Sequence, residues 1–95
     1  MYEWDDDKNK LNVEKHGIDF NLAIEVFSDP CAVVQFNREI QGEIRDQIIG
    51  QIEDEVVILF VIFTHREHKI RLISARKANK KERALYEHQN KKTTN

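Results

Sequence analysis

The residues of this chain best suited to chemistry are four arginines. Arg66 and Arg76 follow apolar, strand-like segments, and Arg45 and Arg71 lie within such segments. A guanidinium group keeps its charge and binds phosphate oxygens in pairs. Such groups can hold a phosphate while negative charge develops on it, and Arg66 and Arg76 are the main candidates for this role, with the other two assisting.

A simpler interpretation of the same arginines stays open. Arg66 and Arg76 are also explained as solvated charges at strand ends. The two arginines within strands are also explained as outward-facing residues that pair with a glutamate, such as Glu43 or Glu53. The phosphate interpretation requires that all four converge in one cationic trough, rather than lie scattered or each locked against a carboxylate.

Three side chains are candidates for moving protons. Histidine is the usual general acid or base near neutral pH, and His65 and His68 lie in the basic part of the chain. Tyr86 can donate a proton or stack on a base, although a packing role with its hydroxyl at the rim fits it as well. The His-x-x-His spacing is weak evidence for a metal, because no cysteine or acidic ligand cluster accompanies it. Neither a metal nor a cofactor is expected.

Positive charge gathers towards the end of the sequence. Residues 1–60 hold fourteen acids and five Lys or Arg, a balance of −9, and residues 61–95 hold three acids and ten Lys or Arg, a balance of +7. A concentrated positive field attracts nucleic acids. The residues that we expect to supply general attraction to RNA are Lys77, Lys80, Lys81 and Arg83, each of which alone is an ordinary surface charge.

The composition is that of a small globular protein. The 95 residues predict one domain over 1–95, and 40% hydrophobic content supports one compact core. The single cysteine, Cys31, fits a reducing cytoplasm. No apolar run approaches membrane-spanning length, and the acidic start is unlike a signal peptide, so we expect a cytoplasmic protein without a membrane partner.

Helical patterns lie near both ends of the sequence. Residues 8–16 form the first predicted helix, after three aspartates and before Gly17. Asp19 is the predicted N-cap of a second helix, whose apolar stripe reaches Phe27 before Pro30 stops it. Asn79 caps the final helix, and Glu82 completes a capping box three residues later.

Between these helices the pattern changes to strands. The predicted strands are residues 32–36, 43–50, 56–64 and 70–75, joined by a polar loop at 37–42, an acidic turn at 51–55 and a hairpin loop at 65–69. Short connections favour an antiparallel meander, and the apolar third strand requires cover on both faces. The predicted fold is α+β: two N-terminal helices, a four-stranded antiparallel sheet and a C-terminal helix.

A series of short motifs follows in order along the chain. They are residues 3–5 (EWD), 15–20 (KHGIDF), 26–30 (VFSDP), 42–45 (GEIR), 49–50 (IG), 63–66 (FTHR), 70–76 (IRLISAR) and 82–83 (ER) with Tyr86. In these motifs the sequence resembles, from Trp4 to Tyr86, the BrnT family of bacterial toxins, a branch of the RelE-like ribonucleases of type II toxin–antitoxin systems.

The resemblance implies a toxin that cuts RNA without a metal ion. It also implies a BrnA-like antitoxin of the ribbon-helix-helix class, which binds the toxin and represses their shared operon at its operator DNA. We therefore expect an endoribonuclease that uses the 2′-OH as nucleophile and leaves a cyclic phosphate and a 5′-hydroxyl. The alternative is a non-catalytic module that binds nucleic acid and antitoxin and acts as operon co-repressor.

Overall fold

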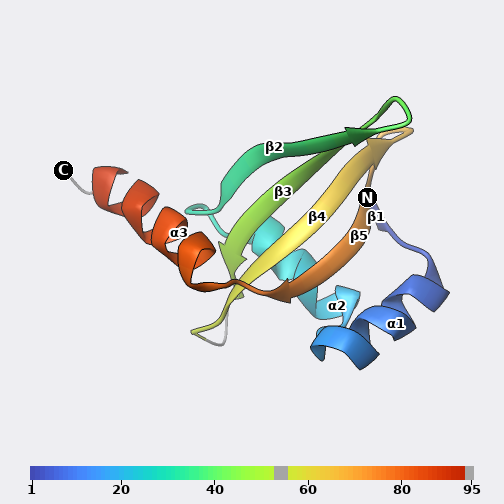
Figure 1. Ribbon diagram of the computed structural model, residues 1–95, viewed down its shortest axis with the longest axis horizontal. Coiled ribbons are helices and arrows are strands. Elements are labelled where there is room, and N and C mark those ends of the chain that lie inside the picture. The colour runs from blue at the N-terminus through green and yellow to red at the C-terminus, as the bar shows by residue number, and fades with distance from the viewer. Residues whose placement is uncertain (53–55, 94–95) are drawn as a thin grey trace.

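The computed structural model describes residues 1–52 and 56–93, so most of the predicted acidic turn, and Glu53 with it, lies outside the described residues. The chain forms one twisted sheet, with the N-terminal helices on one of its faces and the C-terminal helix projecting from one end (Figure 1). The elements are β1 (Tyr2–Glu3), α1 (Asp6–His16), α2 (Phe20–Ala23), the 3₁₀ helix η1 (Ile24–Ser28), β2 (Val33–Ile40), β3 (Glu43–Gln51), β4 (Ile58–Arg66), β5 (Lys69–Lys77) and α3 (Lys80–Thr93).

The α+β class is confirmed, but the prediction of four strands is wrong. The described sheet has five strands in the order β1-β5-β4-β3-β2, in which β2 to β5 form the expected antiparallel meander. β1 is not among the strands predicted from the sequence. It is the fifth strand because it runs parallel to β5, with Tyr2 opposite Ile70, and because the backbone N–H of Ile70 donates to the carbonyl of Met1 at 2.9 Å.

The first helix is fixed by its caps and by one buried amide. Asp5 caps the N-terminus by accepting from two backbone N–H groups, and Gly17 ends the helix with φ of 71°. The amide of Asn12, which is 6% exposed, donates to the carbonyls of Ile18 and Ala75 and accepts from the N–H of Ala75. These bonds attach α1 to β5.

The second predicted helix is shorter than expected, because its last part is a 3₁₀ helix. Asp19 is the N-cap, as predicted, but α-helix gives way to η1 after Ala23. Pro30 disfavours helical backbone in Asp29, which is extended with φ of −78° and ψ of 112°. The final turn therefore tightens, and the N–H of Asp29 donates to the carbonyl of Val26 at 3.2 Å, a spacing of three residues.

Both predicted hairpin loops are too long. Residues 37–40 belong to β2, and only Gln41 and Gly42 turn, with φ of 50° and 82°. His65, Arg66 and Lys69 belong to β4 and β5, so only two residues with positive φ, Glu67 and His68, form the second turn. Two-residue turns with φ above zero match the twist of paired strands, which explains why the strands extend to the hairpin tips.

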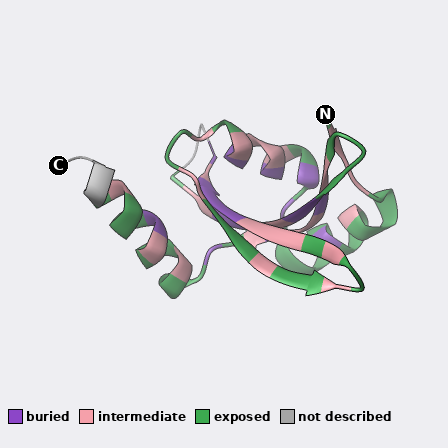
Figure 2. Cartoon of the chain, turned by 90° about the horizontal axis from the view of Figure 1, so that it is seen from above, coloured by how far each residue is buried: buried purple, intermediate pink, exposed green. Residues whose placement is uncertain are grey.

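The two faces of the sheet differ in cover. Alternate residues of β4, Leu59, Val61 and Phe63, pack in the core with Phe20 and Val26 beneath α1, α2 and η1. We call the opposite side of the sheet the open face. Of the described helices only α3 reaches it, where Leu85 and Tyr86 pack on Ile49 and Phe60, and Figure 2 shows this helix extending away from one end of the sheet. The expectation that helices cover the central strand on both faces is therefore met at one end of the open face only.

Helix α3 is held by its cap and by a tyrosine. The capping box is confirmed: the N–H of Glu82 donates to Asn79 Oδ1 at 2.8 Å, and the N–H of Asn79 donates to Glu82 Oε1 at 2.9 Å. Farther along, the ring of Tyr86 packs with Ile49 and Phe60, and its hydroxyl donates to Asp29 Oδ2 at 2.7 Å.

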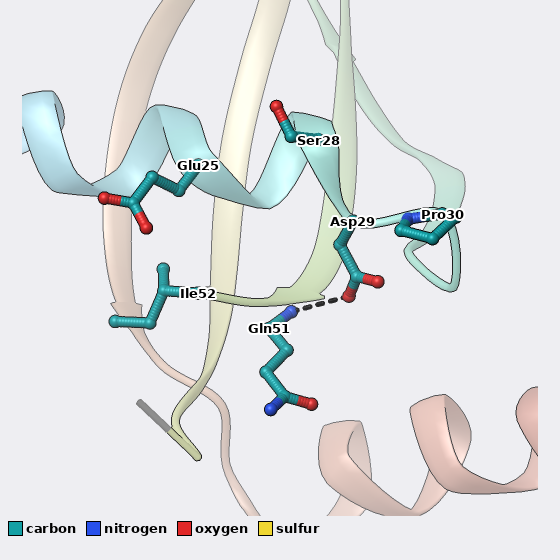
Figure 3. Close-up of a pocket in the computed structure, with 6 residues that line it drawn as sticks. All are labelled: Glu25, Ser28, Asp29, Pro30, Gln51 and Ile52. Atoms are coloured by element: carbon teal, nitrogen blue, oxygen red, sulfur yellow. Dashed lines mark hydrogen bonds between the residues drawn. The ribbon is translucent and has the colours of Figure 1, made fainter. Parts of the chain in front are cut away.

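Asp29 is the point at which three segments meet. Its Oδ2 also accepts from the backbone N–H of Gln51 at 2.8 Å, beside a cavity of about 240 Å³ that Glu25 and Ile52 help to line (Figure 3). Its Oδ1 accepts from the N–H of Cys31 at 2.9 Å. One carboxylate therefore connects η1, β3 and α3.

We predict that Tyr86→Phe lowers the free energy of unfolding by about 2 kcal/mol, because it removes a buried hydrogen bond to a charged group. Urea unfolding of both proteins measures the difference. Tyr2→Phe is the matched control, since the Tyr2 ring packs on Phe27 and its hydroxyl has no hydrogen bond in the described structure. Equal losses for the two variants would contradict a specific role for the bond to Asp29.

Candidate functional site

The open face presents ordered rows of side chains across neighbouring strands. The pairing of β2 to β5 aligns two of these rows: Val33, Ile49, Phe60 and Arg76, followed by Gln35, Gln47, Ile62 and Ser74. Beyond them Arg38 on β2 lies directly opposite Arg45 on β3. Polar amides therefore lie between two groups of arginines on one surface.

A groove of about 370 Å³ crosses this surface. Its lining is Asn37, Arg38, Arg45, Phe60, Ile62, Ile73, Ser74 and Arg76. Three arginines thus surround a floor of apolar side chains. Of the four arginines singled out in the sequence, the groove includes Arg45 and Arg76.

Two β-bulges shape the groove. The pairing of β2 with β3 shifts between Phe36 and Arg38, and that of β4 with β5 shifts between Ile62 and Phe63. The extra residues are Asn37 and Ile73, and both line the groove. A bulge redirects side chains and is common next to active sites, so the two irregularities support this groove as a functional site.

Arg76 is held at one end of the groove by an aromatic ring and a carboxylate. Its guanidinium carbon lies 4.3 Å from the centre of the Phe60 ring. Its Nη1 and Nη2 donate to the two carboxylate oxygens of Glu82 at 2.7 and 2.8 Å. These bonds raise the pKa of Arg76. For Glu82, burial acts to raise the pKa, but the bonds from Arg76 and from the Asn79 N–H outweigh burial, so that the pKa of Glu82 is lowered.

Arg38 and Arg45 form the other wall of the groove, and their side chains make fewer hydrogen bonds than that of Arg76. Nε of Arg45 is buried and lies 3.5 Å from Glu43 Oε1, but it makes no hydrogen bond. Arg38 has a single side-chain bond, from Nε to Asn37 Oδ1 at 3.2 Å. Like charges directly opposite each other on a sheet are destabilising, so this pair lowers stability unless an anion lies between them.

Arg38 was missed by the sequence reasoning because residues 37–42 were assigned to a loop. A usable signal was present in the pair Gln41–Gly42, since glycine at the second position of a two-residue turn favours a tight hairpin. With that turn in place, β2 extends to Ile40 and places Arg38 opposite Arg45.

Arg66 and Arg71 lie towards the other end of the β4–β5 hairpin and do not line the groove. Arg66 pairs with Lys69, which is seven residues, or about 23 Å of strand, from Arg76. Arg66 donates from Nε to Glu43 Oε2 at 2.9 Å, and this bond is the main reason for the lowered pKa of Glu43. Arg71 contacts Glu3 at 3.3 Å. One phosphate therefore cannot contact both Arg66 and Arg76.

All four arginines predicted from the sequence lie within 4.0 Å of a carboxylate, and they do not form a single trough. The pairs differ in strength: Arg76 makes two short bonds to its carboxylate, whereas Arg45 makes none. Partly exposed ion pairs contribute only about 0–1 kcal/mol. A phosphate can therefore compete for these arginines, most easily for Arg45.

The proton-transfer candidates lie outside the groove. The ring of His65 lies 5.7 Å from that of Phe63, which points to the helix-covered face, and His68 occupies the exposed β4–β5 turn. The hydroxyl of Tyr86 donates to Asp29. Burial is the main cause of a strongly raised pKa for Tyr86, and the bond to Asp29 is the second cause. In the described part of the chain, no group of three or more His, Cys, Asp or Glu is placed to hold a metal ion.

The remaining basic residues surround the Arg76 end of the groove. Lys77 ends β5, and Lys80, Lys81 and Arg83 lie in the first turn of α3, all of them exposed. Arg83 donates to the carbonyl of Ala78 at 2.8 Å. Together they extend the positive surface from Arg76 onto the helix.

Across the residues described, no helix is both long and apolar enough to cross a membrane.

Comparison with known proteins identifies the family. A search among curated proteins finds no match to this chain. Residues 4–82 match the family model described as "Ribonuclease toxin, BrnT, of type II toxin-antitoxin system", and because this match covers most of the sequence and agrees with a basic groove suited to RNA, the chain belongs to the BrnT family of ribonuclease toxins.

Proposed function

We propose that this toxin is a metal-independent endoribonuclease that binds the scissile phosphate of RNA in the groove of the open face. The observation that carries the proposal is the direct opposition of Arg38 and Arg45 across the groove from Arg76. Two opposed cations without a hydrogen-bonded carboxylate are unfavourable in the free toxin and are stabilised by an anion between them.

The reaction would be attack by the 2′-oxygen on the adjacent phosphorus, with cleavage of the bond from phosphorus to the 5′-oxygen. A base removes the proton of the 2′-OH, an acid protonates the departing 5′-oxygen, and the products are a 2′,3′-cyclic phosphate and a 5′-hydroxyl. In this proposal Arg38, Arg45 and Arg76 stabilise the charge that develops on the phosphorane. Arg76 turns part of its donor set from Glu82 to the phosphate.

The outer basic residues would hold the rest of the strand. Lys77, Lys80, Lys81 and Arg83 lie beyond Arg76, and Arg66 and Arg71 lie towards the opposite end of the face. Phosphate contacts on both sides of the groove position RNA without reading its sequence.

Proton transfer would require a side chain from outside the groove lining. Tyr86 fits it poorly, because its hydroxyl is bonded to Asp29. His65 and His68 are at the tip of the β4–β5 hairpin, so they would act only on RNA that extends to that tip. These three side chains therefore belong among the variants to be tested rather than in an assigned mechanism.

A second function is favoured by the lining of the groove, because none of the proton-transfer candidates His65, His68 and Tyr86 is part of it. In that case the toxin binds nucleic acid without cutting it and acts as an operon co-repressor with its antitoxin. For either function we propose a BrnA-like, ribbon-helix-helix antitoxin that covers the open face with acidic side chains and brings the complex to operator DNA.

We predict that Arg45→Ala with Arg76→Ala lowers cleavage of single-stranded RNA in EDTA at least about 100-fold, as loss of a transition-state donor does in other enzymes. The matched control is Lys10→Ala with Lys15→Ala, which removes two charges from exposed positions of α1. End analysis of the fragments should show cyclic phosphates and 5′-hydroxyls. If folded wild-type toxin leaves RNA uncut, the co-repressor function is favoured instead.

We also predict that Arg38→Ala with Arg45→Ala weakens RNA binding without loss of stability. Removal of the opposed charges should leave the free energy of unfolding equal or up to about 1 kcal/mol higher. The logarithm of the binding constant falls as the logarithm of the salt concentration rises, and the magnitude of this slope should decrease by about 1.4, the value for two lost contacts to a single strand. An unchanged slope, or a slope that falls equally for the α1 control, would exclude phosphate binding at this pair.

A further inference from the structure

We infer that a chain of side-chain amides beside the groove selects the base next to the bound phosphate, and that it favours guanine. This inference rests on the proposed binding of RNA to the open face. It concerns Gln35, Gln47 and Asn37, which lie between the Arg76 row and the pair of Arg38 and Arg45.

The three amides are joined in series by hydrogen bonds. Arg38 Nε donates to Asn37 Oδ1 at 3.2 Å, and Asn37 Nδ2 donates to Gln47 Oε1 at 2.9 Å. Gln47 Nε2 then donates to Gln35 Oε1 at 3.2 Å. The series therefore begins at a groove arginine and ends at an exposed glutamine on the edge strand.

The arginine fixes the direction of the whole series. An isolated amide can rotate by half a turn and exchange its oxygen with its nitrogen, but a guanidinium has donors only. Asn37 must therefore turn its oxygen to Arg38 and its nitrogen to Gln47. The same requirement passes on to Gln35, whose Nε2 is left facing outward.

The outward end of the series consequently offers donors. Both N–H groups of Gln35 Nε2 and the second N–H of Gln47 Nε2 have no hydrogen-bond partner in the described structure. Guanine presents two adjacent acceptors, O6 and N7, on one edge, whereas uracil presents the single acceptor O4 there, and adenine and cytosine present an amino group beside an acceptor or in its place. Bases in single-stranded RNA expose these edges, so fixed donors favour guanine.

The surroundings supply a platform for such a base. Ile62 pairs in register with both Gln47 and Ser74 and is part of the groove floor. A base lying on Ile62 would have the amide series along one edge and the arginines at its phosphate. Selection of the base and binding of the phosphate are therefore properties of adjacent residues.

The experiment maps cleavage sites in a pool of single-stranded RNAs randomised at the positions around the cut, in EDTA. Wild-type toxin should cut preferentially beside guanine. Gln47→Leu breaks the series in its middle and should reduce this preference about tenfold, which is the scale of one specific base contact. Lys10→Ala, at an exposed position of α1 and outside the groove, should leave the preference and the total cleavage unchanged.

Two further variants test the direction of the series. Gln47→Glu offers acceptors only, so Gln35 should rotate and present its oxygen, and the preference should shift from guanine to adenine and cytosine. Arg38→Lys keeps the charge but loses the Nε donor to Asn37, so the preference should relax. A preference for guanine that is unchanged in Gln47→Leu and Gln47→Glu would overturn the inference.

Failure of the inference is distinguishable from failure of the proposed function. Cleavage by the wild type without any base preference overturns the inference and leaves the ribonuclease function intact. If the wild type cuts no RNA, the ribonuclease function fails, and affinities for short RNAs that differ in one base replace cleavage as the measurement. Equal affinities would then overturn the inference, and a guanine preference that Gln47→Leu removes would support it.

Discussion

The alternation of side chains along a strand is the constraint on which the rest of this structure depends. Each strand turns one set of residues to the helices and the other set to the open face. On β4, Val61 and Phe63 are in the core, while Phe60 and Ile62 are in or beside the groove. A shift of one residue in β3, β4 or β5 would bury arginines and expose core residues.

The two bulges are controlled departures from this alternation. At each bulge the extra residue and the residue after it both line the groove. These are Asn37 with Arg38 on β2 and Ile73 with Ser74 on β5. The bulge in β2 also places Asn37 next to Arg38, to which it is bonded. The groove is thus produced by the backbone irregularities as much as by the residues that line it.

Local sequence signals predicted the elements well and their meeting points poorly. The caps at Asp19 and Asn79 were predicted, because a cap depends on a few adjacent residues, whereas the N-cap Asp5 was only one of three aspartates before a helix predicted to begin at residue 8. The fifth strand was not, because Tyr2 and Glu3 become a strand only through partners at Ile70 and Arg71. The strand extensions at both hairpins were missed because polar residues near a turn resemble a loop when pairing is unknown.

The candidate site was predicted with the same limits. Residue chemistry pointed to arginines, and the structure brings Arg45 and Arg76 to one groove but leaves Arg66 distant. The carboxylate pairs of Arg71 with Glu3 and of Arg76 with Glu82 join separate elements. The first joins strands far apart in sequence and was not recognisable from it. The second uses the capping-box glutamate that was predicted, but its bond to Arg76 was not predicted.

The position of β1 has a consequence for how the fold is completed during translation. Tyr2 and Glu3 are synthesised long before their partners on β5, and Arg71 and Glu3 are separated by 68 residues. Until β5 leaves the ribosome, neither the last sheet pairing nor the ion pair beside it can form, and Arg76 is absent as well. A nascent chain therefore cannot assemble the arginine groove before nearly all of this domain has been made.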